Sequence, residues 1–134
     1  MDMELDSGIY NLIIYLPLDK VIKVGSLGEF EFESGYYVYT GTAQRNLLAR
    51  INRHKSKDKK LHWHIDYLLQ EADVAAVRTW EGSKELECQI HQSLLKRSEF
   101  TEPVLGFGAS DCNCNTHLSY SKERPKIDEE VKVD

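Results

Sequence analysis

The sequence lacks a long hydrophobic run. Its longest apolar stretch, residues 9–16, is interrupted by Asn11 and is far shorter than the about 18 residues that a membrane-spanning helix requires. The first seven residues are acidic, whereas a secretory signal begins with a basic segment. We therefore expect no membrane span and a cytoplasmic protein.

Cysteine is also scarce, with three residues in a chain of 134. An odd number, with Cys112 and Cys114 separated by one residue, is a poor basis for a disulfide framework. The sequence therefore favours reduced thiols and a reducing compartment.

Internal repeats and domain linkers are missing as well. We expect one domain over residues 1–120 and a disordered, charged tail over residues 121–134.

Five cysteines and histidines in the second half of the chain could in principle supply zinc ligands. They are Cys88, His91, Cys112, Cys114 and His117. The spacing between Cys112 and Cys114 is tighter than that of the usual zinc-binding pair, and a buried cysteine is ordinarily a small hydrophobe. We therefore do not expect a zinc site, although a small zinc-stabilised interaction domain stays open as an alternative.

The chain also has no excess of positive charge. The 22 acidic residues outnumber the 17 lysines and arginines, which gives a net charge of −5 and argues against general nucleic-acid binding. The cations are nevertheless concentrated between residues 45 and 60, where Asp58 is the single acid. They are Arg45, Arg50, Arg53, Lys55, Lys57, Lys59 and Lys60.

This basic window could bind a DNA phosphate backbone. Exposed charges more than about 10 Å away are screened at about 0.1 M salt, so a polyanion would respond to the window and not to the net charge. We expect phosphate contacts from Arg45, Arg53, Lys55, Lys57, Lys59 and Lys60. The alternative is a solvated helix end followed by a lysine-rich loop, and charge alone leaves both interpretations open.

Hydrophobic patterning predicts an antiparallel sheet. Residues 9–16 are nearly all apolar, as in a central strand that is buried on both faces. Residues 29–33 alternate between glutamate and phenylalanine, which is typical of a half-exposed strand. The predicted strands are residues 9–16, 21–24, 29–33, 36–40, 74–80 and 117–120. The first four are joined by short turns and should therefore be antiparallel.

Three helices are predicted, over residues 43–54, 61–71 and 83–96. We expect the first to open at Thr42 and the third to be capped by Ser83. Within the first helix, Arg50 and His54 are four residues apart and so share one face. An arginine on such a face can donate two hydrogen bonds to phosphate oxygens.

A set of short motifs follows the order of these elements. Gly8-Ile9-Tyr10 begins the first strand, Tyr39-Thr40-Gly41 ends another, Arg50 and His54 lie on the next helix, and Glu87 lies on a later helix. Together they resemble the GIY-YIG nuclease superfamily. The chain is most similar to a subfamily that is sometimes joined to an endonuclease III domain. The residues that carry this likeness are 35–41 (GYYVYTG), 62–68 (HWHIDYL), 87–88 (EC) and 106–112 (GFGASDC).

The resemblance implies a fold and an activity. The fold is an α/β (α+β) domain with a small central antiparallel sheet, about three flanking helices and, in this chain, an extra β-hairpin. The activity is metal-dependent endonuclease hydrolysis of a DNA phosphodiester, with a role in DNA repair and an unidentified repair enzyme as a potential partner. The implied catalytic residues are Tyr10, Tyr39, Arg50, His54 and Glu87.

The chemistry of these side chains agrees with the implied roles. Glu87 is a hard oxygen ligand for one Mg²⁺ or Mn²⁺ ion, and Arg50 can stabilise charge on the phosphoryl group. Either Tyr10 or His54 could activate the attacking water, and the sequence leaves that choice open. A binding module that kept the fold without efficient catalysis is the competing hypothesis.

Overall fold

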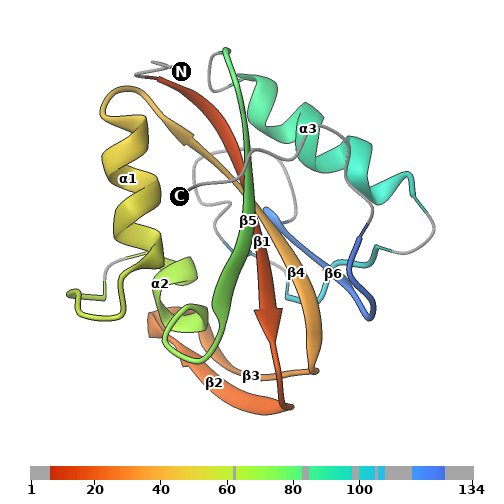
Figure 1. The fold of residues 1–134 in the computed structure, drawn as a ribbon. Helices are drawn as coiled ribbons and strands as arrows, with labels where there is room; N and C mark the ends of the chain where they lie inside the picture. The colour runs from red at the N-terminus through yellow and green to blue at the C-terminus, as the bar shows by residue number, and fades with distance from the viewer. Residues whose placement is uncertain are drawn as a thin grey trace.

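The structure, a computed structural model, describes residues 7–61, 63–82, 85–97, 100–104, 106–107 and 116–125. Its centre is a four-stranded antiparallel sheet in the order β5-β1-β4-β6, beside a two-stranded sheet of β2 and β3 (Figure 1). The strands are β1 (Gly8–Leu16), β2 (Lys20–Val24), β3 (Gly28–Phe32), β4 (Gly35–Ala43), β5 (Asp73–Trp80) and β6 (Leu118–Ser121). The helices are α1 (Leu47–Lys55), α2 (His64–Leu68) and α3 (Glu85–Leu95). The predicted fold class, including the extra hairpin, is confirmed.

Strand β1 lies in the middle of the sheet and pairs with β4 along its whole length, from Gly8 opposite Ala43 to Leu16 opposite Gly35. Its other edge pairs with β5. Eight of its nine residues are buried, which explains why the strand is apolar on both faces. The hairpin of β2 and β3 separates β1 from β4 in sequence, forms its own sheet and packs against α2.

The two faces of the main sheet carry two separate cores. Helices α1 and α2 cover one face, and α3 covers the other (Figure 1). Alternate β1 residues therefore serve different cores: Leu12 packs with the α1 and α2 side chains, whereas Ile13 packs with Leu94 of α3. This alternation decides on which side of the sheet each candidate site residue lies.

Two predicted helices are shorter than expected. We expected the first to open at Thr42, but β4 continues to Ala43 because Thr42 and Ala43 still pair with β1. Helix α1 then begins after Asn46, which has a left-handed conformation with φ 57°. The second helix was predicted over residues 61–71, but α2 spans only His64–Leu68. Local amphipathicity does not show where pairing with a distant strand keeps the backbone extended.

The end of the chain also differs slightly from the prediction. Strand β6 includes Ser121, which we had placed in the tail, and the described residues continue to Pro125. Residues 126–134 of the predicted tail lie outside the described residues, as does Ser83, the expected cap of the third helix. In the part of the chain that the structure describes, no helix has the length and apolar character needed to cross a membrane.

Candidate active site

Tyr10 and Tyr39 lie on the neighbouring strands β1 and β4, and their ring centroids are 6.3 Å apart. Gly41 is the direct pairing partner of Tyr10. A Cβ atom at Gly41 would lie 2.6 Å from the Tyr10 ring and its hydroxyl oxygen. The glycine is therefore required because the phenol ring of Tyr10 lies across the backbone of β4.

His54, on helix α1, forms a 2.9 Å hydrogen bond between its Nε2 and the Tyr10 hydroxyl. Both side chains are 2% exposed. Burial raises the pKa of Tyr10 to about 12, although the nearby Arg50 guanidinium opposes the shift. Burial, together with the positive charge of Lys59, lowers the pKa of His54 to about 3. At neutral pH the pair is therefore an uncharged phenol beside an uncharged imidazole.

Arg50 comes from the same helix and reaches the end of β4. Its Nη1 donates a 3.1 Å hydrogen bond to the backbone carbonyl of Thr42. Its guanidinium also lies 4.7 Å from the centre of the Trp63 ring, and the Arg53 guanidinium lies 4.5 Å from the same ring. These contacts hold the Arg50 side chain in a partly exposed position, where it is available to an anion.

Glu87 approaches the same place from the opposite face of the sheet. It belongs to α3, and its Oε2 accepts a 2.8 Å hydrogen bond from the Thr42 hydroxyl. Thr42 thus contacts Arg50 through its carbonyl and Glu87 through its side chain. Burial is the largest cause that raises the pKa of Tyr10 and of Tyr39. In both residues the Arg50 charge opposes this rise and the Glu87 charge adds to it. Five predicted residues therefore lie close enough together to interact electrostatically: Tyr10, Tyr39, Arg50, His54 and Glu87.

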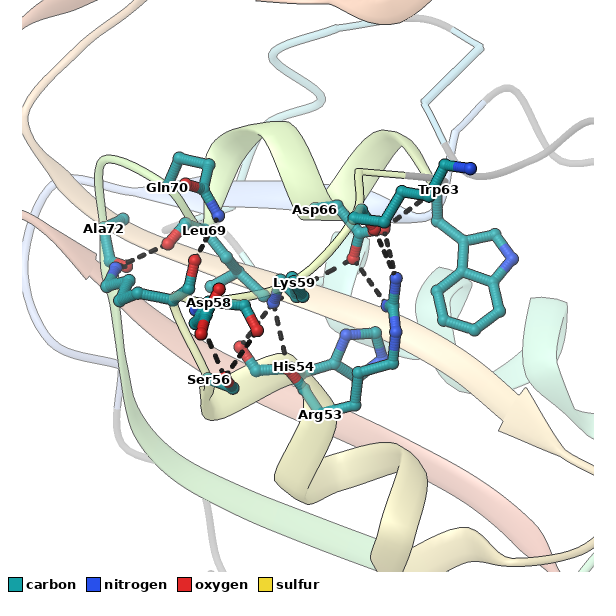
Figure 2. Close-up of polar contacts among 12 residues, drawn as sticks. Arg53, His54, Ser56, Asp58, Lys59, Trp63, Asp66, Leu69, Gln70 and Ala72 are labelled. Atoms are coloured by element: carbon teal, nitrogen blue, oxygen red, sulfur yellow. Dashed lines mark hydrogen bonds and ion pairs between the residues drawn. The ribbon is translucent and has the colours of Figure 1, made fainter.

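Arg53, which we had expected to contact DNA, is occupied inside the protein (Figure 2). It donates two hydrogen bonds to Asp66, of 2.9 and 3.1 Å, and Asp66 is fully buried. The second oxygen of Asp66 also accepts the backbone N–H of Trp63 at 2.8 Å. Such a bidentate pair has a fixed geometry. It anchors α2 and Trp63 against α1, and so supports Arg50.

Two lysines of the basic window also bond internally. Lys59 donates to the carbonyls of Arg53 and His54 at the end of α1, and its side chain is only 5% exposed (Figure 2). Lys57 donates to the carbonyls of Leu69 and Ala72 beyond α2. A lysine at such a position satisfies carbonyls that have no partner within the helix. Our interpretation of Arg53, Lys57 and Lys59 as a free phosphate-binding patch is therefore revised.

The exposed cations of the window are Arg45, Lys55, Lys57 and Lys60. If DNA binds here, reversing Arg45 and Lys60 to glutamate should weaken binding by about 10-fold or more at low salt and reduce its salt dependence. Lys59→Glu should instead lower the free energy of unfolding, because it removes a helix cap and buries a new anion. Fluorescence anisotropy with labelled DNA and urea unfolding would separate the two effects. Unchanged affinity in the Arg45/Lys60 variant would show that these two residues do not contact DNA.

Nearly the whole chain matches one protein-family model. A model described as "Domain of unknown function DUF123" matches residues 9–133, nearly the whole chain. The chain belongs to the DUF123 family. No curated protein and no solved structure matches it. The family description states no activity.

Sequence reasoning missed three residues that organise the site of this DUF123 domain. Thr42 had been interpreted only as the start of a helix, and Trp63 and Asp66 only as part of a motif. One local signal could have identified Asp66: it lies three residues after Trp63 at the start of α2, where a carboxylate commonly accepts a backbone N–H. No local signal shows that Thr42 contacts α1 and α3 together.

The five candidate zinc ligands are only partly described. Cys88 Sγ lies 3.5 Å from His117 Nε2, and the rings of His91 and His117 are 5.9 Å apart. The expectation of reduced thiols stays a prediction. Cys112 and Cys114 lie outside the described residues. Within the described ranges, no group of three histidine, cysteine or acidic side chains is arranged to hold a metal ion.

Proposed function

We propose that this protein is a metal-dependent endonuclease of the GIY-YIG type that hydrolyses a phosphodiester of DNA. The proposal rests on one observation, which is that the motif residues are far apart in the sequence but lie close together in the fold. Tyr10 and His54 are hydrogen-bonded at 2.9 Å, while Arg50 and Glu87 both contact Thr42. These side chains come from two strands and from helices on opposite faces, and the core alone does not require a buried carboxylate beside them.

Arg50 is the phosphate-binding group in this proposal. Its guanidinium is always charged, is partly exposed and is oriented by Trp63 and the Thr42 carbonyl. An arginine held in this way needs little reorganisation when charge develops on a phosphoryl oxygen. It would contact the scissile phosphate, while Arg45, Lys55 and Lys60 contact the phosphates of the surrounding backbone.

Tyr10 and His54 position the attacking water. Tyr10 stays a phenol at neutral pH because its pKa is raised to about 12, and His54 stays neutral because its pKa is lowered to about 3. We assign the hydrogen-bonding proton to Tyr10 and the accepting lone pair to His54 Nε2. The Tyr10 oxygen then keeps a lone pair that can accept a hydrogen bond from the attacking water, with the Tyr39 ring packed beside both.

Glu87 is the residue that would hold the metal ion. Magnesium is commonly bound by one or two carboxylates, with water and substrate oxygens completing its coordination. A single buried carboxylate, oriented by the Thr42 hydroxyl, fits that requirement. When bound, Mg²⁺ or Mn²⁺ would stabilise negative charge on the phosphate and the leaving oxygen.

A second function is favoured by the burial of the tyrosines. Tyr10 is 2% and Tyr39 is 9% exposed, so a substrate cannot reach their hydroxyls without local movement. A nucleic-acid-binding module of the same fold would need only Arg50 and the exposed cations. The two functions differ in one observable, which is metal-dependent strand cleavage.

The test is a cleavage screen of duplex, nicked, flap and junction DNA with Mg²⁺ and Mn²⁺. We expect cleavage of at least one of these substrates, and we expect Arg50→Ala to lower the rate by about 10²- to 10³-fold, the scale for losing one preorganised charge stabiliser. Lys23→Ala, which changes an exposed cation outside the basic window, should change the rate much less. DNA binding without cleavage under every condition would favour the binding module.

A further inference from the structure

Both carboxylate oxygens of Glu87 have a close polar neighbour. Oε2 accepts the Thr42 hydroxyl at 2.8 Å, and Oε1 lies 3.5 Å from Nδ1 of His117. Glu87 is 6% exposed and His117 is 2% exposed. A glutamate side chain has three rotatable bonds, so two contacts at its end restrict the direction in which its remaining lone pairs point.

We propose that Thr42 and His117 are positioning residues for Glu87, which orient its carboxylate toward the metal ion. This inference rests on the proposed function, because it assigns the metal to Glu87. Groups that hydrogen-bond to metal ligands generally orient them and tune their affinity, and their loss commonly costs about 10- to 100-fold in metal binding. Thr42 donates such a hydrogen bond to Oε2, and His117 Nδ1 lies 3.5 Å from Oε1 of the same carboxylate.

The location of Thr42 suits this role. It lies near the end of β4, where the ladder to β1 still holds its backbone opposite Ile9. The same residue accepts the Arg50 hydrogen bond on its carbonyl. The Thr42 backbone therefore fixes the distance between the phosphate-binding group and the metal-binding group, and its hydroxyl sets the orientation of the second. Replacing the hydroxyl alone would leave the Arg50 contact in place.

His117 is held just as firmly by its backbone. Its N–H donates to the carbonyl of Phe107 at 2.8 Å, and its own carbonyl accepts from Thr40 at 3.0 Å. The residue directly precedes β6, which pairs with β4. Because β4 also carries Thr42, the two contacts of Glu87 start from one rigid part of the sheet. Helix α3 supplies the carboxylate, and the sheet determines where it points.

The experiment compares Mn²⁺ binding in wild type, Thr42→Val and Thr42→Ser by electron paramagnetic resonance. Valine keeps the shape and strand preference of threonine but removes the hydroxyl. We expect Thr42→Val to weaken Mn²⁺ binding by about 10- to 100-fold and Thr42→Ser to stay within about threefold of wild type. Thr101→Val, an exposed threonine of the same chain, is the matched control and should leave binding unchanged.

His117 is tested with asparagine and alanine, because asparagine can place an N–H donor near the position of Nδ1. Asparagine should retain more Mn²⁺ affinity than alanine, and circular dichroism checks that both variants fold. Equal Mn²⁺ affinity in wild type and Thr42→Val would overturn the proposal, whatever the result at His117.

One further variant separates this inference from the proposed function. If Glu87→Gln binds Mn²⁺ as well as wild type does, the metal assignment itself is wrong. If Glu87→Gln loses binding while Thr42→Val and the His117 variants retain it, Glu87 still holds the metal but the positioning role is refuted. Mn²⁺ affinity is measured without substrate, so the test does not depend on finding the DNA that is cleaved.

Discussion

Replacing Glu87 with glutamine should abolish metal-dependent cleavage, with a rate loss on the order of 10³-fold or more. The substitution keeps the size of the side chain and one oxygen that can accept the 2.8 Å hydrogen bond of Thr42. It removes the negative charge on which a divalent cation depends. DNA binding should stay near the wild-type level, because an anion beside a phosphate does not contribute to affinity. Single-turnover cleavage and anisotropy on the same DNA measure the two quantities.

The matched control for this prediction is Glu81→Gln. Glu81 is exposed and undergoes the same chemical change close to the start of α3. Its cleavage rate should differ from wild type by less than about twofold, as is usual for an exposed charge. Full metal-dependent activity in Glu87→Gln would remove Glu87 from the mechanism. Glu85 and Asp111 would then be the next carboxylates to test.

The second large effect concerns stability. Asp66→Ala should lower the free energy of unfolding by about 3–5 kcal/mol, the usual cost of removing one partner of a buried ion pair. Asp66 accepts two hydrogen bonds from Arg53 and one from the Trp63 backbone, and the Lys59 ammonium lies 4.0 Å away. Removing the carboxylate leaves these donors without their acceptor. Urea unfolding followed by circular dichroism gives the change directly.

An exposed ion pair in the same protein provides the comparison. Lys20 and Glu71 are 3.1 Å apart, but their side chains are 44% and 40% exposed. Glu71→Gln should therefore change the free energy of unfolding by no more than about 1 kcal/mol. If Asp66→Ala costs as little as Glu71→Gln, the Asp66 network does not anchor α2, and the support that we assign to Trp63 and Arg50 would be lost.

Much of the fold could be predicted from local patterns in the sequence. The apolar run of β1, the alternation in β3 and the short turns are determined by residues close together in the chain, so the antiparallel sheet and extra hairpin were expected. The candidate site residues could be listed because the motifs that carry the family resemblance are also local. Each motif lies within a few residues, as with Arg50 and His54 on one turn of α1.

The tertiary structure decided what those patterns leave open. Pairing with β1 extends β4 to Ala43. This places Thr42 between Arg50 and Glu87, which are 37 positions apart in the sequence. The fold also determines that Lys57 and Lys59 cap carbonyls and that Arg53 pairs with Asp66. The sequence alone does not show whether a charged side chain faces solvent or a buried acceptor. Only long-range packing, which brings the acceptor within hydrogen-bonding distance, distinguishes the two.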